Sequence, residues 1–133
     1  GVYMTVKKID MTWIVVKDVK AAVKYYTDVV GLKLMEYHED YGWAELQGYE
    51  GGSRFGIAQV NPQEPVQPGQ NAVVTFTVGN LEKVKEEMVK KGAKCEGEII
   101  EIPGHVKMQT VIDSDGNRFQ VCESLHHHSC CHC

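Results

Sequence analysis

The chain has 133 residues, of which 43% are hydrophobic and only four are proline, so its composition fits one compact domain with an ordinary core. Fourteen basic and eighteen acidic residues give a net charge of −4, which disfavours a nucleic-acid-binding protein because such proteins carry a basic patch. No apolar run approaches the roughly 20 residues of a membrane span and the first residues lack the apolar stretch of a signal peptide, so we expect a soluble, cytoplasmic protein that does not contact a membrane.

The first half of the chain is predicted to form a strand, a helix and three more strands. A β-branched apolar run favours the strand, and Asp18 after it is a suitable helix N-cap. Gly31 stands where a left-handed residue ends a helix. The expected order is strand 9–16, helix 19–30, and strands 32–38, 43–47 and 54–60.

The second half repeats this pattern, with Asn80 in the place of Asp18 and Gly92 in the place of Gly31. The expected order is strand 72–78, helix 81–91, and strands 98–102, 106–112 and 118–123. We therefore predict a single domain, residues 1–124, that contains two βαβββ repeats at about 7–60 and 71–124. The linker 61–70 between them holds three of the four prolines, which neither a helix nor a strand ladder accommodates.

The cysteines fall into two groups. Cys95 and Cys122 are far apart, which is not the pattern of a disulfide framework and indicates a reducing compartment. Residues 125–133 are rich in His and Cys. Their imidazoles and thiols are possible metal ligands, but we expect a disordered tail outside the fold.

Three stretches of the sequence resemble one protein family. They are Val16-Lys17-Asp18-Val19, the segment 25–34, and the segment 113–121, in which Ser114 replaces the proline of the family's Asp-Pro-Asp-Gly-Asn motif. Over about residues 7–124 the chain thus resembles the vicinal-oxygen-chelate superfamily, which includes glyoxalase I, bleomycin- and fosfomycin-resistance proteins and extradiol dioxygenases. The resemblance implies an α+β fold in which two βαβββ modules form a curved mixed sheet around a cleft, and it favours a homodimer.

The residues at the superfamily's metal positions are poor ligands. In metal-dependent members, four cleft positions on the opening and closing strands of the two modules carry His, Glu or Gln. The resemblance places these positions at Met11, at Val73, at Gln120 and at Gln59 or Ile57. Thioether and isopropyl groups cannot replace imidazole nitrogen or carboxylate oxygen around such a cation, so we expect no metal and no cofactor.

The function that these observations favour is metal-independent binding of a small molecule. We expect a protein of the bleomycin-resistance type, with a role in antibiotic resistance and a drug-like, aromatic or cationic ligand; no catalytic residue is assigned. Trp13 and Trp43 would stack on a planar ring, and Glu45 would meet a cationic group. The predicted cleft residues are Met11, Trp13, Trp43, Glu45, Gln59, Val73, Thr75, Arg118 and Gln120.

Several of these residues have an ordinary structural interpretation as well. Trp13 has apolar neighbours and suits a core position equally well, and Trp43 suits a hairpin cover. Glu45 alternates with Ala44 and Leu46, which suits a solvated carboxylate on the outside of a strand.

Two other functions stay open. The first is a superfamily enzyme, a lyase, isomerase or oxygenase, that uses relocated metal ligands at His38, Glu45 and His105 or metal-free acid–base chemistry at His105. The second is an interaction module whose cleft is filled by its own Met11 and Trp13 side chains.

Overall fold

A computed structural model describes residues 10–71 and 73–125 of the chain. The expectations for the tail concern residues 126–133, which lie outside the described residues. The elements follow in the order β1 (Met11–Val16), α1 (Val19–Asp28), β2 (Lys33–His38), a 3-10 helix η2 (Glu39–Tyr41), β3 (Trp43–Gly48), β4 (Gly51–Gln59), β5 (Val74–Thr77), α2 (Leu81–Lys90), β6 (Lys94–Ile102), β7 (Val106–Ile112) and β8 (Arg118–Ser124).

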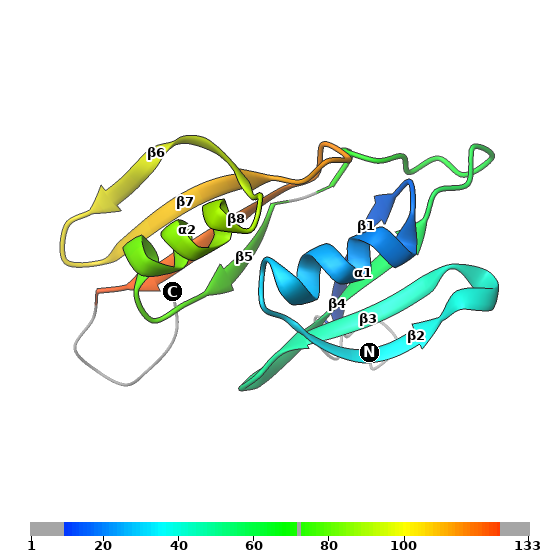
Figure 1. Ribbon diagram of the computed structural model, residues 1–133, viewed down its shortest axis with the longest axis horizontal. Helices are drawn as coiled ribbons and strands as arrows, with labels where there is room; N and C mark the ends of the chain where they lie inside the picture. Colours follow the sequence, from blue (N-terminus) through cyan, green and yellow to red (C-terminus); the bar gives the residue numbers. More distant parts are fainter. Residues whose placement is uncertain (1–9, 72, 126–133) are drawn as a thin grey trace, which may run out of the picture.

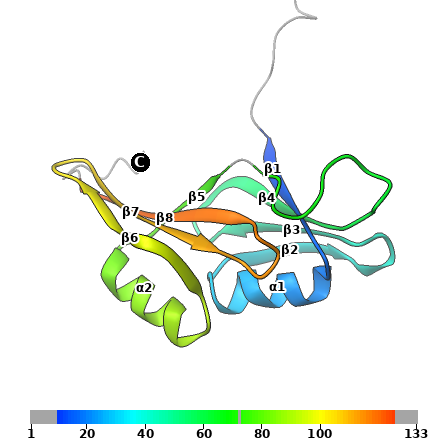
Figure 2. The same cartoon turned by 90° about the horizontal axis from the view of Figure 1, so that it is seen from above.

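The strands form two mixed sheets of four strands each. The first sheet has the order β1-β4-β3-β2 and the second sheet the order β5-β8-β7-β6. In each, the opening strand is parallel to the closing strand, and the remaining pairs are antiparallel. Both helices lie on the same side of the sheets, and the opposite faces of both sheets stay open (Figures 1 and 2). This arrangement confirms the predicted α+β fold of two βαβββ modules.

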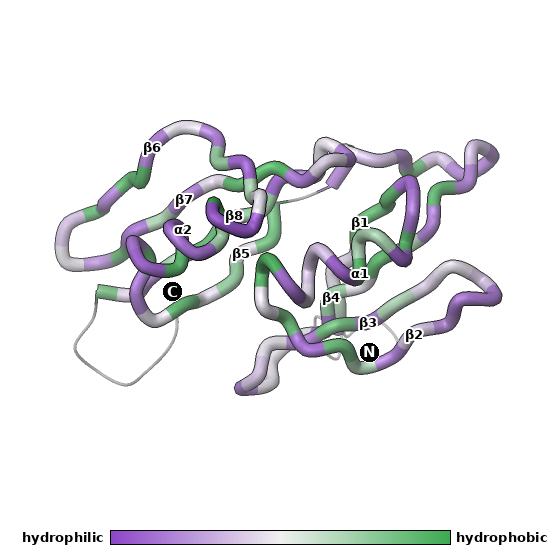
Figure 3. Tube along the Cα trace, in the orientation of Figure 1, coloured by the Kyte–Doolittle hydropathy of each residue, from purple (hydrophilic) through white to green (hydrophobic). Residues whose placement is uncertain are grey.

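Helix boundaries follow from local hydrogen bonds that the sequence predicts. Oδ1 of Asp18 accepts from the backbone N–H groups of Lys20 and Ala21 at 3.1 and 3.4 Å, which satisfies donors at the start of α1. Gly31 follows α1 with a φ of 93°, a conformation that favours glycine. Purple and green alternate along both helices in Figure 3, as expected for helices with one buried face. Neither helix in the described part of the chain is long and apolar enough to cross a lipid bilayer.

Two strands begin earlier than predicted. β4 begins at Gly51 and not at residue 54, and β6 begins at Lys94 and not at residue 98. The sequence signal is weak at both starts because glycine and charged residues have low strand propensity. Pairing with the neighbouring strand overrides it: β6 stays paired with β7 across a bulge at Gly97, where the buried Gln109 donates its Nε2 to the Gly97 carbonyl at 3.0 Å.

The core lies between the helices and the sheets and joins the two modules. Ile14 and Val16 of β1 are 2% and 0% exposed. The ring of Tyr26 on α1 lies 5.6 Å from that of Phe119 on β8, and the ring of Phe55 on β4 lies 5.4 Å from that of Phe76 on β5. Burial of these aromatic rings at the junction gives both modules a shared core.

The loop between β7 and β8 holds the second module against the first. Asn117 is buried and donates its Nδ2 to the carbonyl of Val15 on β1 at 3.0 Å, while its Oδ1 accepts from the backbone N–H of Gly69 at 2.8 Å. The backbone N–H of Lys17 donates to Oδ1 of Asp115 at 2.9 Å. The loop between β7 and β8 thus also connects β1 and the segment 61–70.

The segment 61–70 is folded as a compact loop. Nε2 of Gln67 donates to the carbonyls of Asn61 and Glu64 at 3.2 and 2.8 Å, and these bonds close the loop on itself. Because the loop is also tied to Asn117 through Gly69, it places its residues at a fixed position beside the end of β4.

Candidate functional site

The open face of the first sheet, opposite α1, carries a row of functional side chains. Trp13 on β1 is paired with Gly56 on β4, Gly56 with Glu45 on β3, and Glu45 with Glu36 on β2. Paired residues point to the same side of a sheet, so these positions form one line across four strands. Ala44, next to Glu45, points the other way and is fully buried under α1.

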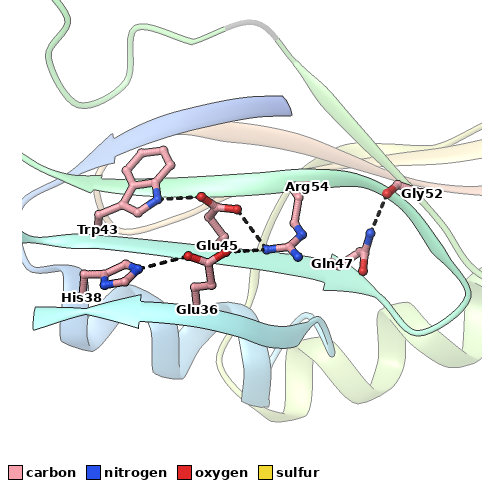
Figure 4. Close-up of polar contacts among 7 residues, drawn as sticks. All are labelled: Glu36, His38, Trp43, Glu45, Gln47, Gly52 and Arg54. Carbon is pink, nitrogen blue, oxygen red and sulfur yellow. Dashed lines mark hydrogen bonds and ion pairs between the residues drawn. The ribbon is translucent and has the colours of Figure 1, made fainter. Parts of the chain in front are cut away.

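A chain of polar contacts runs along this face (Figure 4). Nε2 of His38 lies 3.0 Å from Oε1 of Glu36. Nη1 of Arg54 donates to Oε2 of Glu36 at 3.2 Å and to Oε1 of Glu45 at 2.9 Å. The indole Nε1 of Trp43 donates to Oε2 of Glu45 at 2.9 Å. Each side chain therefore holds its neighbour in one orientation across β2, β3 and β4.

The charges on this face are only partly balanced. Two carboxylates, Glu36 and Glu45, face one guanidinium, that of Arg54. The hydrogen bond from His38, helped by the Arg54 guanidinium, holds the pKa of Glu36 below its usual range. The side chain of Glu45 is 18% exposed and bonded to two partners, so it is not the solvated carboxylate that strand alternation alone would allow.

Gly56 makes room for a pair of tryptophans. The rings of Trp13 and Trp43 lie 6.3 Å apart at 65°, edge to face. A Cβ atom added at Gly56 would lie 2.5 Å from Cη2 of Trp43 and 2.9 Å from Cβ of Trp13, so any side chain there would displace the indole of Trp43. Trp13 is 46% exposed, which corrects the interpretation of this residue as part of the core. A glycine inside a strand is a known signal of such a close approach, but the sequence alone did not indicate that Gly56 makes room for the two tryptophans.

The open face of the second sheet holds the other predicted residues. Arg118 makes a two-point ion pair with Glu96, with distances of 2.7 and 3.0 Å. Nε2 of Gln120 donates to Oγ1 of Thr110 at 3.4 Å. Thr75, which is paired with Gln120, is exposed, and Val73 is 55% exposed. The predicted cleft residues thus divide between the open faces of the two sheets, and the aromatic ones lie only on the first. Met11 also belongs to the first sheet, where it is paired with Arg54.

Gln59, a predicted cleft residue, lies apart from the row of side chains on the open face, although it lines the cavity at the end of β4 that is described below. It shares the helix-facing side of β4 with the buried Ile57. Its Oε1 accepts from the backbone N–H of Val19 at 2.9 Å, and its Nε2 donates to the carbonyl of Lys17. Gln59 therefore fixes the turn between β1 and α1, because its side chain meets the backbone groups at the start of that helix.

The strand register also identifies the fourth of the superfamily's metal positions. Trp13 and Thr75 are equivalent positions in the two modules, because each stands five residues before the cap of the following helix. Trp13 is paired with Gly56, and Thr75 is paired with Gln120. The equivalent of Gln120 in the first module is therefore Gly56. The expectation of Gln59 or Ile57 for this position was wrong, because the pairing register of β4 with β1 differs from the one assumed.

The residues at these positions do not fit a divalent cation. Met11, Gly56 and Val73 offer no oxygen or nitrogen donor from a side chain, and Gln120 offers only a neutral amide. Among the described residues, no group of three or more His, Cys, Asp or Glu side chains is arranged to hold a metal. His105 lies at the turn between β6 and β7 of the second sheet, so the alternative ligand set with His38 and Glu45 of the first sheet does not come together.

A cavity of about 680 Å³ opens beside the tryptophan pair. Trp43 and Ala58 of the open face line it together with Tyr41, Gln59 and the loop residues Pro62 and Glu64. Its size is that of a pocket for a small organic molecule. Glu64 was not predicted as a site residue, because only the fold of the segment 61–70 brings it to the cavity.

A smaller cavity of about 180 Å³ lies between α1 and the β7–β8 loop, lined by Asp18, Tyr25 and Asp113 among others. The hydroxyl of Tyr25 is buried without a hydrogen-bond partner among the described residues. Burial, with a smaller contribution from Asp113, raises the pKa of Tyr25 to about 12. The cavity is on the helix side, away from the tryptophans.

Comparisons with known proteins agree with this architecture. Residues 8–121 match the family described as the Glyoxalase/Bleomycin resistance protein/Dioxygenase superfamily. No curated protein matches the sequence. Among solved structures, a member of that superfamily from Sphaerobacter thermophilus aligns with a TM-score of 0.75 at 13% identity, covering 90% of this chain and 98% of the other.

Two further structures have the same fold. TnmS3, an antibiotic binding protein from a Streptomyces species, aligns with a TM-score of 0.74 at 17% identity and covers 91% of this chain and 98% of its own. A virulence protein from Salmonella typhimurium aligns with a TM-score of 0.70 at 18% identity, covering 91% and 99%. At these identities the likeness concerns the fold.

Proposed function

This chain belongs to the Glyoxalase/Bleomycin resistance protein/Dioxygenase superfamily, and on that basis we propose that it binds an aromatic small molecule on the open face of the first sheet without a metal ion. The ligand's ring would stack on Trp13 and Trp43. Glu45 and Arg54 would hold the indoles in place and offer polar contacts at the edge of the ring.

The observation that carries the proposal is the tryptophan pair over Gly56. An exposed tryptophan on a sheet normally has several orientations, but here the Nε1 of Trp43 is bonded to Glu45, and Glu45 is bonded to Arg54. Side chains that are already ordered lose little conformational entropy when a ligand arrives, so such a surface binds more tightly than a mobile one. The donor-poor positions Met11 and Gly56 support a metal-independent role.

The Streptomyces neighbour gives further support, since it is described as an antibiotic binding protein and has the same fold. A resistance role of the bleomycin type, in which the protein sequesters a drug, is the finer form of the proposal. A homodimer in the cytoplasm is part of the same expectation, and size-exclusion chromatography with light scattering would test the dimer.

Tryptophan fluorescence tests the proposal, because the chain has two tryptophans and both lie at the proposed site. Titration with planar aromatic antibiotics is expected to change the tryptophan fluorescence with a saturable dependence on concentration. The single-tryptophan variants W13F and W43F assign the signal, and each is expected to weaken binding by about three- to thirtyfold, as the loss of one aromatic contact implies. A panel without saturable change, or unchanged affinity in both variants, would contradict the proposal.

One contact favours an enzyme as the second candidate. The imidazole of His38 is held by Glu36 at 3.0 Å and stacks on Tyr41 at 4.9 Å, beside the cavity. A histidine oriented by a carboxylate is suited to act as a general base. Turnover of a bound compound that H38N abolishes while binding persists would favour this candidate over a pure binding role.

A further inference from the structure

The cavity beside Trp43 is lined by two aromatic residues and one acidic residue. The aromatic residues are Tyr41, which is 63% exposed, and Trp43, and the acidic residue is Glu64. The residues that line the cavity, all within the described part of the chain, include no lysine or arginine. The guanidinium of Arg54, on the open face of the same sheet, is already bonded to Glu36 and Glu45.

Glu64 is the one acidic residue among the described residues that line the cavity. Within residues 10–71 and 73–125 it takes part in none of the ion pairs, whereas Glu45 is paired with Arg54. This changes the expected division of roles: Glu45 orients Trp43, and Glu64 is the group that can meet a cation.

The backbone that carries these lining residues is held by hydrogen bonds. Glu64 belongs to the loop that Gln67 closes through the carbonyls of Asn61 and Glu64. Gly42 separates Tyr41 from Trp43 with a φ of 65°, and the backbone N–H of Gln59 donates to its carbonyl at 2.8 Å. The lining residues are therefore carried by ordered backbone.

From this arrangement we infer that the ligand is an organic cation, a quaternary ammonium or protonated amine joined to an aromatic body, and that its charged end lies between Tyr41, Trp43 and Glu64. Aromatic faces attract cations through the ring quadrupole, and a carboxylate in the same cavity adds a Coulombic attraction. The inference rests on the proposed function, because the aromatic body of the same ligand would lie on the tryptophan pair.

A matched pair of probes tests the charge. 1-Methylquinolinium is a permanent cation, and quinoline has nearly the same shape but is uncharged at neutral pH. Isothermal titration calorimetry with the full chain is expected to give an affinity about tenfold higher for 1-methylquinolinium than for quinoline, the size of one cation–π contact with a carboxylate nearby. The preference is expected to shrink as salt is added, because the carboxylate is exposed to solvent.

The variant E64Q removes the charge and keeps the shape of the side chain. It is expected to lower the affinity for 1-methylquinolinium by about threefold or more and to leave quinoline unchanged. E50Q is the matched control, since Glu50 is an exposed carboxylate at the other end of the β3–β4 hairpin and its loss is expected to change neither affinity.

The outcomes separate this inference from the proposed function. Equal affinities for the two probes, or an E64Q variant that binds 1-methylquinolinium as the unaltered chain does, would overturn the organic cation while the aromatic site stands. If neither probe binds, while planar aromatic antibiotics still change the fluorescence, the cation inference fails alone. If none of these compounds binds, both fail.

Discussion

The hydroxyl of Tyr26 donates a hydrogen bond of 2.8 Å to Oδ2 of Asp113, a residue 87 positions further along the chain. Tyr26 lies on α1 of the first module and Asp113 at the start of the β7–β8 loop of the second. Both are buried, and Asp113 also binds Asn117, which reaches the backbone of β1. This contact joins the two modules at the point where their aromatic residues pack.

Y26F is expected to lower the free energy of unfolding by about 1–2 kcal/mol. The variant keeps the ring and removes the hydroxyl, so a buried carboxylate oxygen loses one of its two donors but keeps the 3.1 Å bond from Asn117. Urea unfolding followed by circular dichroism measures the change. Y49F, at a tyrosine that is 76% exposed, is the control and is expected to be neutral. Equal stability of Y26F and the unaltered chain would show that the bond does not hold the modules together.

G56A is expected to displace Trp43 and to destabilise the protein by about 1–3 kcal/mol, the usual cost of overpacking. The added methyl group would meet two tryptophan side chains at less than 3 Å, and one of the contacts is with the Cβ of Trp13, which cannot rotate away. Fluorescence of the W13F background reports on Trp43, whose emission is expected to shift to the red as the indole meets water.

The control for this change is G79A, because Gly79 has no neighbour within 4 Å of a built Cβ and no positive φ. It is expected to be neutral or slightly stabilising. If G56A leaves stability, emission and ligand affinity unchanged, the tryptophan pair does not depend on the glycine.

Stability is expected to fall between about pH 10 and 12, and Tyr25 contributes part of the loss alongside Tyr26, whose pKa burial also raises. Burial raises the pKa of Tyr25 from 10.0 to about 12, so the folded state keeps a proton that the unfolded chain releases in this window. Stability decreases with pH wherever the folded state binds more protons, so the contribution is fully present below pH 10 and is lost as the pH rises toward 12.

Y25F has no phenolic proton at this position, so it is expected to reduce the loss of stability at alkaline pH. It is expected to keep the stability at neutral pH, since the buried hydroxyl has no hydrogen-bond partner among the described residues. Urea midpoints at several pH values give both quantities, with Y49F again as the control. A Y25F protein with the same alkaline slope as the unaltered chain would assign the loss to other groups.

Divalent metal ions are expected to leave the body of the protein unaffected. Met11, Gly56, Val73 and Gln120 provide a single neutral donor among them, which is too little to hold Zn²⁺, Ni²⁺ or Mn²⁺. A chain ending at Leu125 removes the His- and Cys-rich residues after it. With that chain, these ions are expected to produce no rise in Tm, and metal analysis is expected to find less than one bound ion per chain. One tightly held ion in the shortened chain would contradict the metal-independent proposal.

The sequence predicts the fold well because its signals are local. Asp18 and Asn80 each cap a helix through bonds within three residues, and Gly31 and Gly92 follow those helices with positive φ. The repeat of these signals predicted two βαβββ modules, which the two four-stranded sheets confirm.

Most of the site depends on contacts between distant residues. Glu45 is a partner of Arg54 and Trp43 only because β3 and β4 are paired in one register, and a shift of one residue would turn these side chains to the other face. The same register puts Gly56, and not Gln59, at the position that corresponds to Gln120.

The amino-acid sequence by itself therefore determined the order of strands and helices, the superfamily and the absence of good metal donors on the opening strands, since these follow from residue types and short spacings. Tertiary structure decided which carboxylate is neutralised, which glycine makes room for an indole and where the loop places Glu64. The reason is physical: strand register and loop closure bring together atoms that are far apart in the chain, and neither composition nor periodicity carries that information.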